Sequence, residues 1–115
     1  MMKGEEIIKK YDFHDSCVVG ILHEMDNIKI KIDLCMWRQK GYIDGERELK
    51  EVILKFYSVH DYKWNSYKKE EDIDYDTILQ ISYNKKIIKI ILEDNDVSII
   101  TFKCNEIELI EWLCI

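Results

Sequence analysis

Apolar and polar residues alternate along much of the 115-residue chain. The clearest example is the run from residue 28 to residue 36, which has an apolar side chain at every even position: Ile28, Ile30, Ile32, Leu34 and Met36. A period of two places such side chains on one face of a β-strand. The pattern predicts a strand with one buried face, and the preceding Asp26 and Asn27 are residues that tight hairpin turns favour.

Six other segments have the apolar content of strands, and most are separated by short turns rich in Asn, Asp and Lys. The predicted strands cover Ser16 to Met25, Ile28 to Met36, Glu48 to Val59, Ile78 to Tyr83, Ile87 to Glu93, Val97 to Lys103 and Glu106 to Trp112. The third has apolar residues on both faces, which is typical of a central strand. The connections are too short for the helical crossovers of parallel pairing, so antiparallel pairing is expected.

We therefore predict a mainly β protein with one domain over residues 1–115. Its expected architecture is a single antiparallel sheet of about seven strands in hairpin or meander order, curled into a small sandwich or a partly open barrel. Residues Lys3 to Tyr11 are compatible with a short N-terminal helix, whereas His60 to Asp76 is irregular and predicts a long loop. Composition agrees, because the chain has 20 Ile and no Ala, and β-branched residues suit strands.

The chain is acidic, with 17 Lys and Arg against 23 Asp and Glu and a net charge of −6. Nucleic acid is therefore an unfavourable partner, since phosphates require clustered Lys and Arg. The sequence has neither a signal-peptide pattern nor the apolar run of roughly 18 residues that predicts a membrane span, so a cytoplasmic protein is expected. No Gly-rich phosphate loop is present, and no cofactor is expected. Four cysteines without C-x-x-C spacing are expected to be reduced thiols: Cys17, Cys35, Cys104 and Cys114.

The segment Phe13-His14-Asp15-Ser16 contains the three residue types of a hydrolase triad. Neighbouring residues on a strand point to opposite faces, whereas a triad needs side chains that converge. We therefore interpret this segment as structural: Phe13 fills the core, and the polar side chains bond the backbone where the first strand begins. With no other catalytic motif, the protein is not expected to be an enzyme.

Two His-Asp pairs suggest an alternative, a metal-binding protein or a small metal-dependent enzyme. His14-Asp15 precedes the first predicted strand, and His60-Asp61 follows the third. If these strands pair, two imidazoles and two carboxylates converge, and this ligand set suits Zn or Fe. Against this alternative, the sequence has no close histidine spacing such as H-x-x-x-H.

Aromatic and acidic residues gather in the two longer loops and in the strand beside them. Amphipathic rings supply large contact areas at protein interfaces, and acidic groups around them favour a basic partner. The rings could instead cover the open end of the sheet, and Tyr42 belongs to the same aromatic group. The predicted partner-binding residues are Trp37, Tyr57, Asp61, Tyr62, Trp64, Tyr67, Glu70, Glu71 and Asp72.

The run Tyr11-Asp12-Phe13-His14-Asp15-Ser16, followed by a strand, a short turn, the strand from Ile28 and then Trp37, resembles small uncharacterised bacterial proteins with an F-H-D-S motif. Some similar proteins are grouped with the immunity proteins of bacterial toxin systems. The resemblance implies a cytosolic, non-catalytic protein that blocks a cognate toxin, or binds another protein, by direct contact.

We therefore expect a non-enzymatic protein-binding module, immunity-like in role, whose acidic charge favours a basic toxin domain as the partner. The metal-binding alternative stands beside it. A third alternative is a structural domain that self-associates through a sheet edge, because no Pro protects any edge.

Overall fold

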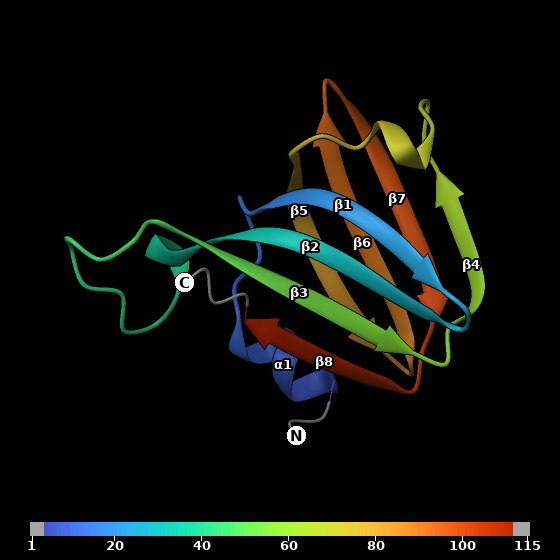
Figure 1. Ribbon diagram of the computed structural model, residues 1–115, viewed down its shortest axis with the longest axis horizontal. Coiled ribbons are helices and arrows are strands. Elements are labelled where there is room, and N and C mark those ends of the chain that lie inside the picture. The colour runs from blue at the N-terminus through green and yellow to red at the C-terminus, as the bar shows by residue number, and fades with distance from the viewer. Residues whose placement is uncertain (1–3, 112–115) are drawn as a thin grey trace.

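Eight antiparallel strands form one curled, open sheet, accompanied by a short N-terminal helix (Figure 1). This computed structural model describes residues 4–111. The helical elements are α1 (Gly4–Lys10) and the 3₁₀ helices η1 (Met36–Arg38) and η2 (Glu70–Asp72). The strands are β1 (Cys17–Glu24), β2 (Asn27–Cys35), β3 (Leu49–Tyr57), β4 (His60–Asn65), β5 (Asp76–Asn84), β6 (Ile87–Asp94), β7 (Asp96–Lys103) and β8 (Glu106–Glu111). The predicted mainly β, antiparallel fold class is confirmed.

The sheet folds into two facing halves. Its strand order is β4-β7-β6-β5-β1-β2-β3-β8, and β1 joins β5 through two residue pairs, Cys17 with Thr77 and Val18 with Asp76. Just beyond those pairs, β1 and β5 each contain a register shift, and such bulges bend strands. The half made of β1, β2, β3 and β8 therefore packs over the half made of β4, β5, β6 and β7, as in a small sandwich (Figure 1).

Alternating apolar residues from both halves meet in the core between them. The buried side chains of β2 are Ile28, Ile30, Ile32 and Leu34, as its alternation predicts, and those of β6 are Ile88, Ile90 and Leu92. Phe56 of β3 meets Phe102 of β7 edge-on, with 5.0 Å between the ring centroids. Burying each of these side chains contributes roughly 1.5–3 kcal/mol to folding.

Helix α1 is too short to be stable alone and depends on docking. Its Ile7 is buried in the core. Gly4 approaches the sheet so closely that a Cβ there would lie 3.0 Å from Ile107 of β8 and 3.1 Å from Tyr83 of β5. The helix therefore contacts both halves. In the part of the chain that the structure describes, no helix is long and apolar enough to cross a membrane.

Strand β4 is a difference from the predicted architecture, which had a loop over residues 60–76. Residues 60–65 pair with β7 and add the eighth strand. Tyr62 and Trp64 face the core at every second position, but Asp61 interrupts the strand pattern with a left-handed φ of 56°. Three pairings, β1–β5, β3–β8 and β4–β7, also join strands that are not consecutive, so the sheet is more than a simple meander.

Candidate functional site

The F-H-D-S motif lies at the start of β1 and is used by the fold. Phe13 and Ser16 are buried. The Ser16 hydroxyl accepts a hydrogen bond from the Cys35 N–H at 2.8 Å. Asp15 has a left-handed φ of 69°, and its N–H donates to the Ile78 carbonyl at 3.0 Å. The Ser16 side chain and the Asp15 backbone therefore tie the beginning of β1 to β2 and β5. Within the described residues, the His14 and Asp15 side chains do not bond the backbone as predicted; they lie 3.1 Å from each other.

Two side chains that follow β2 bind the segment before β1. Arg38 pairs with Asp12 at 3.2 Å and with Asp15 at 3.3 Å. The Gln39 side chain accepts from the Asp12 N–H at 3.0 Å and donates to the carbonyls of Asp12 at 2.6 Å and Cys35 at 2.8 Å. The backbone thus uses both ends of the Gln39 amide. These bonds fix the position of the segment after β2.

The segment between β2 and β3, residues 36–48, forms a closed loop that we call the Trp37 loop. The Met36 N–H donates to the Glu48 carbonyl at 2.8 Å and closes the base of the loop. Inside it, the Tyr42 hydroxyl donates to the Glu46 carbonyl at 3.3 Å. Compact surface loops whose ends lie close together are often functional.

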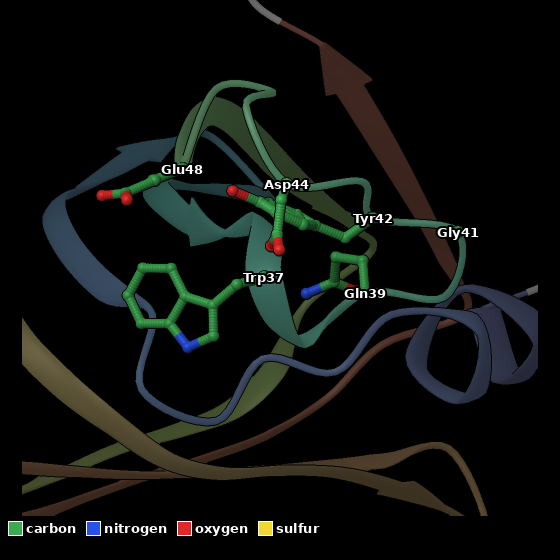
Figure 2. Close-up of a pocket in the computed structure, with 6 residues that line it drawn as sticks. All are labelled: Trp37, Gln39, Gly41, Tyr42, Asp44 and Glu48. Atoms are coloured by element: carbon green, nitrogen blue, oxygen red, sulfur yellow. The ribbon is translucent and has the colours of Figure 1, made fainter.

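A pocket of about 530 Å³ opens within the Trp37 loop (Figure 2). We call it the Trp37 pocket; its lining residues are Trp37, Gln39, Gly41, Tyr42, Asp44 and Glu48. Trp37 is 51% exposed although it is a large aromatic residue. Figure 2 shows the Asp44 carboxylate directed toward the space between Trp37 and Gln39. The volume is in the range of small-ligand pockets.

The charged residues that line the Trp37 pocket are acidic, although the loop as a whole also contains Arg38, Lys40 and Arg47. Within the described chain, Asp44 and Glu48 are its charged lining residues, and it has no Lys or Arg there. Neither carboxylate forms an ion pair or a side-chain hydrogen bond with residues 4–111. Burial raises the pKa of the Tyr42 hydroxyl, and the carboxylates of Glu48, Asp44 and Glu46 raise it further. The pocket therefore offers negative charge that the fold does not use.

In the 60–76 segment, by contrast, the fold uses the aromatic side chains. Tyr62 stacks on Phe102 at 5.9 Å, and its hydroxyl donates to the Glu70 carboxylate. Burial raises the pKa of Tyr62 well above its usual range, and the bond to Glu70 adds to this effect. Glu70 also lies 2.7 Å from the Nε2 atom of His23 on β1. Tyr62 and Glu70 therefore connect the two halves.

Lys68 anchors the same segment through buried charge. Its ammonium lies 2.7 Å from an Asp76 carboxylate oxygen and 2.9 Å from Asp94, and the Asp76 side chain is 1% exposed. Burial lowers the pKa of Lys68, but its bonds to Asp76 and Asp94 outweigh burial and raise the pKa to about 12. The Lys68 ammonium in turn lowers the pKa of Asp94. The Trp64 indole donates to the Lys68 carbonyl at 2.8 Å, and Tyr67 donates to the Asp94 carbonyl at 2.6 Å.

The remaining predicted partner-binding residues are dispersed. Asp61 is exposed and lies 3.4 Å from Lys103. The Tyr57 hydroxyl donates to Glu108 at 2.9 Å, at the end of β3 far from the Trp37 loop. Exposed on η2 are Glu71 and Asp72. Figure 1 shows η1 (teal) and η2 (yellow) on different sides of the molecule, so the predicted set does not form one surface.

The two His-Asp pairs do not converge. His14 lies before β1, next to Asp15, whose N–H bonds to Ile78 near the start of β5. His60 pairs with Lys103 of β7, and Lys103 pairs with Ile87 of β6. Ile87 in turn pairs with Asn84, at the other end of β5. Strand register therefore separates the two imidazoles by most of the length of the sheet. Among residues 4–111, no group of three His, Cys, Asp or Glu side chains is arranged to hold a metal ion.

The described cysteines, Cys17, Cys35 and Cys104, are free thiols. Burial raises the pKa of all three, and that of Cys104 reaches about 11. Raised pKa values disfavour the reactive thiolate, so these side chains act as small apolar groups. Cys114, like Trp112 of the last predicted strand, lies outside the described residues.

Sequence reasoning identified Trp37 and missed Gln39, Asp44 and Glu48 as its neighbours. One available signal was the spacing of Gly41 and Gly45 between two strands, which marks a structured turn and has left-handed φ values of 82° and 98°. The pocket is therefore recognised from the arrangement of its residues in the structure.

Comparison with protein-family models, with curated proteins and with solved structures finds no match to the chain.

Proposed function

We propose that the chain is a non-enzymatic protein-binding module that holds a basic partner protein at the Trp37 pocket. The observation that carries this proposal is a half-exposed indole beside two unpaired carboxylates in an internally bonded loop. Trp side chains contribute strongly to protein interfaces, especially where the surrounding structure holds them in place. An exposed indole with acidic neighbours, carried by a loop whose backbone is hydrogen-bonded, is therefore a suitable anchor for a partner.

Exposed apolar residues extend this surface. Ile43, within the Trp37 loop, is 67% exposed, and Leu49, directly after it, is 48% exposed. Interfaces commonly combine such apolar groups with a charged rim. The net charge of −6 adds long-range attraction for a basic protein, and the pocket carboxylates add local complementarity.

Within this class, we propose an immunity-like role, in which the chain neutralises a basic toxin domain by covering it. The support is the acidic charge and the resemblance carried by residues 11–16. Because Phe13, Asp15 and Ser16 are used by the fold, partner recognition falls to other residues. The Trp37 pocket is our choice for that role.

Affinity capture from the cell of origin tests this proposal, with the wild-type chain and two variants as baits. Trp37→Ala removes the indole from the pocket. Tyr75→Asn is the matched control: Tyr75 is 56% exposed, and Asn tolerates its left-handed φ of 56°. We expect the same basic protein on the wild-type and Tyr75→Asn baits, and at least about tenfold less on Trp37→Ala. Capture of no protein, or equal capture by Trp37→Ala, contradicts the proposal.

A further inference from the structure

We propose that the Trp37 pocket receives one arginine side chain of the partner. The inference rests on the proposed function and names the chemical group that the pocket recognises. The guanidinium of this arginine lies on the Trp37 indole and donates hydrogen bonds to the Asp44 carboxylate, while the Glu48 carboxylate adds negative charge at the rim of the pocket.

Several polar groups around the pocket already form hydrogen bonds or ion pairs within the fold. Gln39 uses its amide oxygen and nitrogen on the backbone of residues 12 and 35, and Tyr42 donates its hydroxyl proton to Glu46. Arg38, the basic residue next to Trp37, is held by Asp12 and Asp15. The charged acceptors that the pocket lining leaves for a ligand are therefore the carboxylates of Asp44 and Glu48.

A cation matches this combination of acceptors and an aromatic ring. The face of an indole attracts cations through its electron-rich π-system, and Trp is the most effective residue in this respect. The carboxylates supply the opposite charge. A cation is attracted by these exposed carboxylates, whereas a neutral ligand gains nothing from their charge and an anion is repelled by it.

Arginine fits better than lysine. A guanidinium is planar, stacks on an aromatic face, and still directs N–H groups outward from its edge toward carboxylates. A lysine ammonium is a strongly hydrated point charge that cannot stack and bond in one plane. Figure 2 shows the Asp44 carboxylate directed toward the space between Trp37 and Gln39, whereas the Glu48 carboxylate is directed away from Asp44. Asp44 is therefore the hydrogen-bonding carboxylate of the pair, and Glu48 adds negative charge at the rim.

Titration of the full chain with three capped tripeptides tests the inference: Gly-Arg-Gly, Gly-Lys-Gly and Gly-citrulline-Gly, which is neutral and close in shape to the arginine peptide. The indole N–H signal of Trp37, followed by ¹H–¹⁵N NMR and assigned with Trp37→Phe, reports binding at the pocket. We expect saturable binding of the arginine peptide with a Kd of about 1 mM. The lysine peptide should bind at least about threefold more weakly, and citrulline should not saturate.

Two doubly substituted chains with the same change of net charge provide the control. Asp44→Asn with Glu48→Gln should weaken arginine binding about tenfold, whereas Glu71→Gln with Asp72→Asn, on exposed η2, should change it less than about twofold. Equal binding of arginine and lysine, equal effects of the two double substitutions, or no saturable shift of the Trp37 signal would overturn the inference. Trp37-dependent capture of a basic protein would still support the proposed function in that case, so the two failures are distinguishable.

Discussion

The Trp37 loop and the 60–76 segment both combine aromatic with acidic residues, but the fold uses them differently. In the 60–76 segment the side chains make the structure: Tyr62 stacks in the core, and Lys68 joins two carboxylates. In the Trp37 loop, backbone bonds and Gln39 make the structure, and the Trp37 indole remains half exposed. Composition alone therefore does not locate a binding site; what matters is which side chains the fold leaves unused.

Lys68→Ala should give the largest loss of stability, about 3 kcal/mol in the free energy of unfolding. The substitution leaves the buried Asp76 carboxylate without its 2.7 Å ion pair, and an uncompensated buried charge is costly. Urea unfolding followed by circular dichroism measures this loss. The control is Lys69→Ala at the exposed neighbouring position, which should change stability by less than about 0.5 kcal/mol. Equal stability of the two variants would show that the 60–76 segment does not depend on the Lys68 charge.

Tyr62→Phe should destabilise the chain by about 1.5 kcal/mol, because it removes a hydrogen bond to the Glu70 carboxylate and keeps the stacked ring. Chemical unfolding is again the measurement, with Tyr75→Phe as the control at a more exposed tyrosine. A loss in Tyr62→Phe no greater than that in Tyr75→Phe would contradict the structural role assigned to this hydroxyl.

Trp37→Ala and Asp44→Asn should each change the free energy of unfolding by less than about 0.5 kcal/mol, since both side chains are exposed. Thermal and urea unfolding should match the wild type, while partner capture falls. This combination separates binding residues from structural ones. A stability loss as large as that of Tyr62→Phe would instead show that Trp37 and Asp44, like Tyr62, are needed for the stability of the fold.

The smallest predicted difference between the 60–76 segment and the Trp37 loop is in the pH dependence of stability. The pKa of Asp94 is lowered by Lys68, so its contribution is present above the usual carboxyl pKa and is lost as the pH falls through the lowered value. The pKa of Lys68 is raised to about 12, so its contribution is present below the usual lysine pKa and is lost as the pH rises toward 12. Between these limits both contributions are constant. Acid unfolding of Asp94→Asn should lack the Asp94 component, and an unchanged acid profile would contradict this assignment.

The strands could be predicted because their signal is local. The apolar positions of β2 repeat every second residue, and its burial follows the same positions. The turns around β6 are likewise encoded by neighbouring residues. Antiparallel pairing then follows from the short connections.

Strand β4 and the Trp37 pocket could not be predicted because they depend on distant contacts. Tyr62 faces inward only because β4 crosses to the far edge and pairs with β7. Gln39 is held by Asp12, 27 residues earlier in the chain. Tyr62 and Trp64 do alternate with polar residues, but two aromatic positions are too few to mark a strand, and the Gln39 contact leaves no periodic pattern. The predicted convergence of His14 with His60 required pairing of the first and third strands, but β2 lies between β1 and β3, and the strand register places the two histidines at opposite ends of β5.

The placement of β4 and β8 has a consequence for how the molecule unfolds. Strand β4 continues from β3 but completes the opposite half, and β8 continues from β7 but completes the half of β3. The halves have thus exchanged their edge strands, and neither can detach without pulling a strand out of the other. We expect one cooperative transition for the described chain. A partner bound at the Trp37 loop, between two strands of one half, would therefore protect the other half as well.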